Sequence, residues 1–295
     1  MLPAAKMASD TVKKEDRVMA MNSVNTNVGA MIALQNLQVT NNELTQVQSR
    51  INTGKKVASA KDNGAVWAIA QGQRAEIGAL NAVKDSLQRG QSAVDVGLAA
   101  GESVSDLLVQ LKEKALSATA SSLTSSARSA LNEDFKSIRD QIATVVSNAS
   151  FNGVNLIDGS STGGFAALAN VEGTSNITVS SQNMSLSGSV VTLGASSEID
   201  TASAATASLA LVSASIDNVG ASLAKLGTGS NSLGTHLTFV GKLQDTLEAG
   251  VGNLVDADLA KESARLQALQ TKQQLGVQAL SIANSSTSIL LGLFR

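Results

Sequence analysis

The sequence predicts a mainly α protein, a long helical coiled-coil bundle formed by the N- and C-terminal regions with a small central segment rich in β-hairpins. Three observations predict this fold. Apolar residues recur at seven-residue spacing near both ends of the chain. The only proline is Pro3, so no proline interrupts a helix beyond it. Hydrophobic residues make up 43% of the chain but aromatic residues only 2%, which favours thin bundles over a thick core.

The longest heptad pattern lies in the last third of the chain. It comprises Leu226, Leu233, Val240, Leu247 and Leu254, and it continues through Leu266 and Leu280 to Leu290 and Phe294. Near the other end, Leu37, Leu44 and Ile51 have the same spacing. Because one narrow helix cannot bury a stripe of this length, each stripe requires a partner. We expect the two ends of the chain to pair along this seam.

The N-terminal region is predicted to hold one helix between two irregular segments. Residues 1–18 show no amphipathic period, and we interpret them as disordered or as lying upstream of the true translation start. The helix begins at Ser23 or Asn25, both good N-caps, and ends before Gly54. Residues 55–76 contain an Asp-Asn-Gly turn and are expected to form an irregular connector.

Two further helices are predicted before the centre of the chain. One begins at Ile77, and its heptad ladder comprises Leu80, Leu87, Val94 and Leu108, with Gly101 in the remaining slot. It ends at the polar run 117–126, in which Thr124 or Ser125 caps a third helix. That third helix carries an apolar stripe of 3.6-residue period.

The central segment is the part of the sequence that predicts strands. Phe151, Asn152 and Gly153 place an Asn-Gly pair between apolar residues, which is the strongest short hairpin signal. The β-branched runs 176–181 and 189–194 are predicted strands. A helical pattern resumes near Thr201, and the glycines Gly227 and Gly229 are interpreted as a soft place in it.

Composition excludes most chemical functions. The net charge is −2 with no basic patch, which argues against nucleic acid. There is no cysteine and one histidine, His236, so neither a thiolate nor a histidine metal site is expected, and no cofactor is predicted. No apolar run approaches the roughly 20 residues of a membrane span, and the N-terminal charges precede no apolar signal region. Asp256 and Asp258 are interpreted as helix caps, so we expect no enzyme.

Three separated motifs resemble bacterial flagellin. The run SRINTGKKVASAKDNGAVWAIA is similar to the family's amino end, with Arg50, Gly54, Lys61 and Asp62 matching and Thr53 in place of a serine. FNGVNLIDG resembles its Phe-Asn-Gly hairpin, and VGNLVDADLAKESARLQALQTKQQLGVQALSIAN resembles its carboxyl signature, with Asp256 and Asp258 in place. The resemblance covers residues 20–158 and 205–295; residues 1–18 have no counterpart in it.

The resemblance implies a filament subunit whose ends form the polymerisation seam. It predicts an inner-tube helix at 19–60, the outer helical domain with its hairpin at 61–158, a short variable segment at 159–204, an outer C-terminal helix at 205–252 and an inner-tube helix at 253–295. The implied partners are other copies of the chain, the flagellar export apparatus with an export chaperone, and cap and junction proteins, with no nucleic acid and no membrane. The implied location is the extracellular flagellum, reached without a cleaved signal peptide.

Two alternatives remain open at the level of sequence. A hook-filament junction protein has a related build and uses the same export system, although the Phe-Asn-Gly hairpin and the length of the matched ends favour flagellin. A cytoplasmic signalling hairpin of the chemoreceptor type is also heptad-based and rich in alanine and serine. That second alternative does not explain the predicted β segment.

Overall fold

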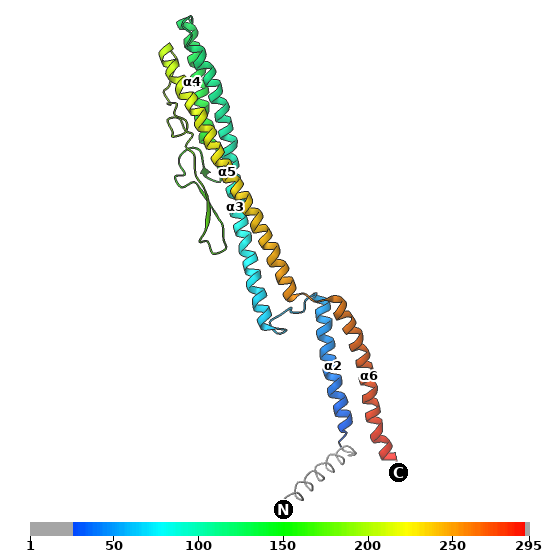
Figure 1. The fold of residues 1–295 in the computed structure, drawn as a ribbon. Coiled ribbons are helices and arrows are strands. Elements are labelled where there is room, and N and C mark those ends of the chain that lie inside the picture. The colour runs from blue at the N-terminus through cyan, green and yellow to red at the C-terminus, as the bar shows by residue number, and fades with distance from the viewer. Residues whose placement is uncertain (1–25, 293–295) are drawn as a thin grey trace, which may run out of the picture. The chain divides into compact units, whose positions relative to one another are not determined.

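The computed structural model describes residues 26–292, and side chains up to residue 285. Its helices are α2 (Val28–Thr53), α3 (Gly64–Ala118), α4 (Ser125–Asn148), α5 (Ala202–Val255) and α6 (Leu259–Gly292), as Figure 1 shows. The mainly α fold is thus confirmed. The predicted tail 1–18, the caps Ser23 and Asn25, the seam residue Phe294 and the side chain of Leu290 lie outside the described parts.

The chain forms two compact units. We call Met1–Gly72 with Gly250–Arg295 the terminal unit, and Gln73–Ala249 the central unit. The terminal unit therefore pairs the two ends of the chain, as the heptads predict. Its first boundary lies at residue 72, within α3, whereas the sequence placed the end of the inner region at residue 60.

In the terminal unit, α2 begins and ends at residues suited to those positions. The side chain of Asn27 caps the helix by accepting a hydrogen bond from the Ala30 amide at 2.9 Å. Gly54 ends it with φ +68°, a left-handed conformation that glycine adopts without steric cost. Beyond Gly54, the chain pairs with the segment before α6 through an antiparallel bridge between Lys55 and Asp256.

The expected connector 55–76 is wrong beyond residue 63, because α3 already begins at Gly64. Asn63, which the sequence suggested as part of a turn, is the cap: its Oδ1 accepts a hydrogen bond from the Val66 amide at 3.1 Å. Its carbonyl oxygen accepts another from the Trp67 amide at 2.9 Å. The same Asp-Asn-Gly residues that favour a turn are also favourable at a helix start, and here the apolar pattern that follows selects the helix.

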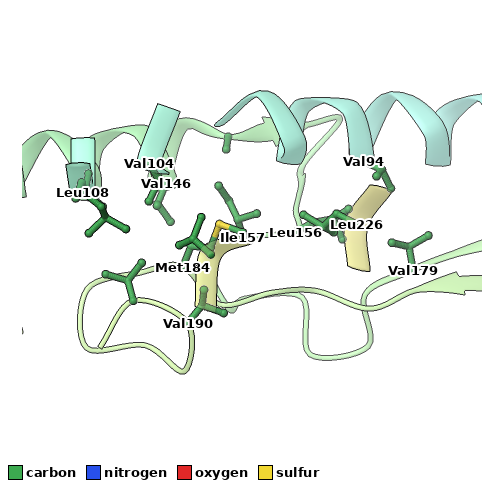
Figure 2. Close-up of a cluster of buried hydrophobic side chains, with 14 of the residues drawn as sticks. Val94, Val104, Leu108, Val146, Leu156, Ile157, Val179, Met184, Val190 and Leu226 are labelled. Carbon is green, nitrogen blue, oxygen red and sulfur yellow. The ribbon is translucent and has the colours of Figure 1, made fainter. Parts of the chain in front are cut away.

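The central unit packs α3, α4, α5 and the central segment around one core (Figures 1 and 2). Its fully buried large side chains include Leu87, Leu108, Phe135, Ile142, Leu156, Ile157, Met184, Leu226 and Leu233. Gly101 occupies its heptad slot for a steric reason: a Cβ there would lie 2.6 Å from Leu223 Cδ2 and 3.3 Å from Met184 Sδ. A larger residue at this position would force the Leu223 side chain to move.

Two small antiparallel hairpins follow α4. The first joins β1 (Ser150–Phe151) to β2 (Val154–Asn155), which confirms the Asn-Gly prediction. The second joins β3 (Phe165–Leu168) to β4 (Asn176–Val179), with Phe165 opposite Val179. β4 confirms the strand predicted at 176–181.

The strand predicted at 189–194 is wrong. Val190 and Val191 are buried, as their β-branched side chains suggest, but their backbone forms no ladder. The Val190 amide donates to the Asn183 carbonyl at 3.0 Å and the Thr192 amide donates to Ser215 Oγ of α5 at 3.0 Å. Burial alone therefore accounts for the apolar run, and loop and side-chain partners satisfy the backbone.

α5 runs without interruption through Gly227 and Gly229, and the soft place predicted there stays a prediction. It also contains an 18-residue window with a mean hydropathy of 1.3, enough by length and composition for a membrane span, which the sequence argument overlooked. The buried stripe of α5, including Val212, Val219 and Leu226, belongs to the core of the central unit. Core helices meet the same hydropathy criterion as spans.

Candidate subunit interface

The contact between α2 and α6 uses one narrow face of each helix. The less exposed residues of α6 follow a strict heptad: Glu262, Leu266, Leu269, Gln273, Gly276, Leu280 and Ala283. Hydrogen bonds fix the antiparallel pairing, from Asn27 Nδ2 to the Ala283 carbonyl oxygen at 2.8 Å and from Gln273 Nε2 to Asn41 Oδ1 at 2.8 Å. The alternation of three and four residues is typical of a coiled coil.

This contact buries little apolar surface. On α2 the buried residues are Thr40 and Val47, and on the described part of α6 they are Glu262 and Leu269. Gly276 removes a side chain from the middle of the contact, and a Cβ there would lie 3.2 Å from Leu37 Cδ1. A helical pair with so small an apolar core is marginal on its own.

The outer faces of the same two helices expose large apolar side chains. Among the described side chains these are Met31, Ile32, Leu34 and Val39 of α2 and Leu259, Leu275, Val277 and Ile282 of α6, with exposures from 48% for Val39 to 69% for Ile282. Between the helices lies an open groove of about 260 Å³ lined by residues of both, including Ala33, Leu37 and Ala279. Several exposed large apolar side chains on a pair of helices with so small a core of its own indicate a protein interaction site.

The predicted seam residues divide between the two units. Leu37, Leu44, Ile51, Leu266 and Leu280 are half-buried in the terminal unit, on the faces by which α2 and α6 contact each other. Leu226, Leu233 and Val240 are fully buried in the core of the central unit, and Leu247 packs against that core. Leu254, near the end of α5, is half-buried in the terminal unit.

Heptad spacing therefore located helix pairing within the chain, but it did not separate the exposed residues of the outer faces from the pairing face. The available signal was weak: Ile32, Val277 and Ile282 are large apolar residues outside the heptad rows. A second apolar face on a helix that already has a partner indicates a second partner.

An ion pair joins α2 to α6 near the end of the contact. Arg50 Nη1 lies 3.1 Å from Glu262 Oε1, and both side chains are largely buried, with exposures of 21% and 11%. Among the described residues, Arg50 Nε and Glu262 Oε2 are buried without a hydrogen-bond partner. The pair therefore ties the two helices together but leaves part of its desolvation uncompensated.

The motif residues of the amino end organise the turn that follows α2. Asp62 Oδ2 accepts hydrogen bonds from the Ala58 and Ser59 amides at 3.0 and 2.9 Å and from the Ser59 hydroxyl. These bonds, above all that from the Ser59 amide, lower the pKa of Asp62 from its ordinary value. Lys61, beside it, is exposed.

The carboxyl motif shapes the start of α6. Asp258 Oδ1 accepts a hydrogen bond from the Lys261 amide at 3.1 Å, the N-cap arrangement that the sequence predicted. Asp256 forms the bridge with Lys55, and the Ala257 amide donates to the Gly54 carbonyl at 2.9 Å. Residues of the two separated motifs thus meet at one strand-like crossing in the terminal unit.

Within the described residues, no group of three or more His, Cys, Asp or Glu side chains gathers in a way that suits a metal ion.

Comparison with known proteins agrees with the pairing of the two terminal regions and with the two motifs. The bacterial flagellin N-terminal helical region matches residues 24–162, and the bacterial flagellin C-terminal helical region matches residues 209–294. Flagellin FljM of Caulobacter vibrioides is 60% identical over 277 residues, covering 94% of this chain and 100% of its own length. The flagellin of Brucella melitensis is 37% identical, covering 93% and 100% of the two chains.

A solved structure from Vibrio parahaemolyticus, provisionally described as a flagellar hook-associated protein, has a TM-score of 0.56 and 15% identity over 66% of this chain and 100% of its own. At that identity it supports the fold alone. The two helical-region matches together span most of the sequence, and the identity to flagellins extends over their whole length. The chain belongs to the bacterial flagellin family.

Proposed function

We propose that this chain builds the flagellar filament by burying the outer apolar faces of α2 and α6 against neighbouring copies. As a flagellin, it is a structural subunit that self-assembles into the filament of the bacterial flagellum, an extracellular appendage. The observation that supports the proposed interface is the exposure of eight large apolar side chains on the described parts of two helices with a thin shared core. Contact with several copies removes these side chains from water.

The pattern of contact suits open-ended growth. In the proposed contact, the outer face of α2 in one copy meets the outer face of α6 in the next. Such a contact is heterologous, and a heterologous contact that does not close produces a helical filament. The stripe residues buried in the central unit, such as Leu233, are excluded from this interface because they already pack within the chain. Leu37, Leu44, Ile51, Leu266 and Leu280 support it indirectly by holding the helix pair.

Export in an unfolded state is part of the proposal. The chain has no cysteine, and its one proline is at position 3, so neither disulfides nor internal prolines oppose unfolding and refolding. The marginal helix pair of the terminal unit gains its stability on joining the filament. We propose the flagellar export apparatus, an export chaperone, the filament cap and junction proteins as the other partners, with no cleaved signal peptide.

The alternatives carry less support. Neither the junction protein nor the chemoreceptor hairpin accounts for the match to flagellins along their whole length. A structural role also agrees with the absence of a sequence motif for catalysis.

The interface is tested by charge substitution on the outer faces. Ile32→Asp and Ile282→Asp each place a carboxylate at a position 54% and 69% exposed in the single chain, so the monomer folds normally. Electron microscopy after heat dissociation and regrowth in salt is expected to show filaments from the parent chain and none from either variant. The matched control is Thr178→Asp, an exposed position of β4, which leaves assembly intact. Normal filaments from both outer-face variants would overturn the proposed interface.

A further inference from the structure

The chain contains two Asn-Gly pairs, Asn63–Gly64 and Asn152–Gly153. In such a pair, the backbone amide nitrogen of glycine attacks the side-chain carbonyl carbon of asparagine, because glycine has no Cβ to obstruct the approach. A nitrogen–carbon bond forms, and the carboxamide nitrogen leaves as ammonia together with the former amide proton. Water then opens the five-membered succinimide to aspartate or isoaspartate.

The two pairs differ in what holds the asparagine side chain. The carboxamide of Asn63 accepts a hydrogen bond from the Val66 amide at 3.1 Å as the cap of α3. The carboxamide of Asn152 has no hydrogen-bond partner among the described residues, and both Asn152 and Gly153 are exposed. Both residues of this pair are therefore accessible to solvent.

The folded turn nonetheless opposes ring closure at Asn152. Asn152 and Gly153 have φ of +50° and +79°, and they are the two residues that connect the paired Phe151 and Val154. This is a type I′ turn, in which ψ of the first central residue is about +30°. With that ψ, the Gly153 nitrogen lies on the opposite side of the Cα–C bond from Cβ, so the carboxamide cannot reach it.

We propose that Asn152 is a site of spontaneous deamidation that the folded β1–β2 hairpin protects and that the unfolded or locally opened chain exposes. The hairpin is fixed by Asn155, which is 5% exposed. Its Nδ2 donates to the Val146 carbonyl of α4 at 2.7 Å, and its Oδ1 accepts from the Ile157 amide at 2.9 Å. These bonds control how often the turn opens.

The products act on the turn differently. Aspartate keeps the backbone and suits a type I′ turn, but it adds a negative charge. Isoaspartate inserts one more atom into the backbone of a two-residue connection, which breaks the pairing of Phe151 with Val154. Chains that stay unfolded before assembly therefore accumulate this damage faster than folded chains do.

The test incubates the full chain in native buffer and in urea and follows both Asn-Gly pairs by peptide mass spectrometry. In urea, Asn63 and Asn152 are expected to react at similar rates, because they form the same dipeptide. In native buffer, conversion of Asn152 is expected to be slower by about tenfold or more, set by the free energy of opening the hairpin.

Two variants separate opening of the hairpin from general loss of structure. Asn155→Ala removes the bond to α4 and the bonds from the Ile157 and Asp158 amides, and it is expected to raise the native rate at Asn152 without changing the rate in urea. Asn132→Ala is the matched control, since Asn132 is also a buried asparagine of the central unit, 4% exposed, but its Oδ1 accepts from the Ile199 amide instead. Asn132→Ala should leave the native rate at Asn152 unchanged.

Three outcomes would overturn the inference. Equal rates at Asn152 in native buffer and urea would mean that the turn gives no protection. Conversion of Asn63 without conversion of Asn152 in urea would show that Asn152 does not deamidate even when the hairpin is unfolded. Equal acceleration by both variants would show that protection comes from the unit as a whole rather than from the hairpin.

Discussion

Single glycines determine how closely segments approach one another in the central unit. Gly229 of α5 faces β4, and a Cβ there would lie 2.7 Å from Val179 Cγ1, whereas a Cβ at Gly227 would meet nothing within 4 Å. The sequence could flag both glycines but could not distinguish them, because the neighbour of Gly229 is 50 residues away in the chain. The difference is a property of packing rather than of helix propensity.

These two glycines provide a matched pair of substitutions. Gly227→Ala is expected to stabilise the protein by about 0.5–1 kcal/mol, because alanine favours the helix and has room. Gly229→Ala is expected to destabilise it by about 1–3 kcal/mol, because Val179 or the helix must move. Thermal unfolding of both variants checks the prediction, and stabilisation by Gly229→Ala would show that the hairpin adjusts freely.

Asp62 gives the turn after α2 a pH dependence. The pKa of Asp62 is lowered in the folded state chiefly by the Ser59 amide. The ionised carboxylate therefore stabilises the turn at pH values above 3.8, the ordinary pKa of the group. This stabilisation is lost as the pH falls through the lowered folded-state pKa. NMR titration should show the Ala58 and Ser59 amide shifts changing together with the Asp62 carboxyl carbon below pH 3.8. The same amides in Asp62→Asn should show no such titration, and a midpoint above 3.8 would contradict the assignment.

At the scale of elements, local signals predicted some helix boundaries and missed others. The stop at Gly54 and the cap at Thr124 are both confirmed, since Thr124 Oγ1 accepts a hydrogen bond from the Ala127 amide at 3.2 Å. The start of α3 was missed because Asn63 suits either a turn or a cap. β3 was missed because two of its four residues are alanine, and it becomes a strand by pairing with β4.

The ion pair between α2 and α6 predicts non-additive substitutions. Arg50→Met leaves the largely buried Glu262 carboxylate without its partner and is expected to destabilise the terminal unit by about 1–3 kcal/mol. The double variant Arg50→Met with Glu262→Leu is expected to recover most of that loss, because no charge remains buried. Hydrogen exchange of the last turns of α2 measures both effects. Additive losses would show that the two side chains act independently.

At the scale of the whole molecule, the sequence predicted that the two ends pair. It could not show which apolar stripes contact neighbouring copies of the chain. Heptad spacing is the same whether the partner is in the same chain or in the next one. Leu233 and Leu266 belong to similar rows, yet one is buried in the central unit and the other is half-buried between α2 and α6. Exposure in the folded chain supplies the distinction, and it directs the assembly proposal to Ile32, Val277 and Ile282.

The two units predict a large difference in local stability before assembly. The central unit holds most of the fully buried large side chains, whereas the α2–α6 contact buries Val47 and Leu269 beside polar residues. In the monomer, the amides of α2 and α6 are therefore expected to exchange with solvent much faster than those around Leu87 in α3. In filaments, the same terminal amides should become protected, because burial of the outer faces stabilises the folded pair.

Hydrogen exchange of monomers and sheared filaments, resolved by peptide, measures this difference. Peptides of α3 and α4 in the core serve as the internal reference, since their protection already exists in the monomer. A chain lacking residues 20–60 and 255–295 should keep that core protection and form no filaments, because it retains the central unit and loses both outer faces. If terminal peptides of the full chain were equally protected in monomer and filament, α2 and α6 would be a stable pair without neighbours, and the energy of assembly would have to come from the central unit.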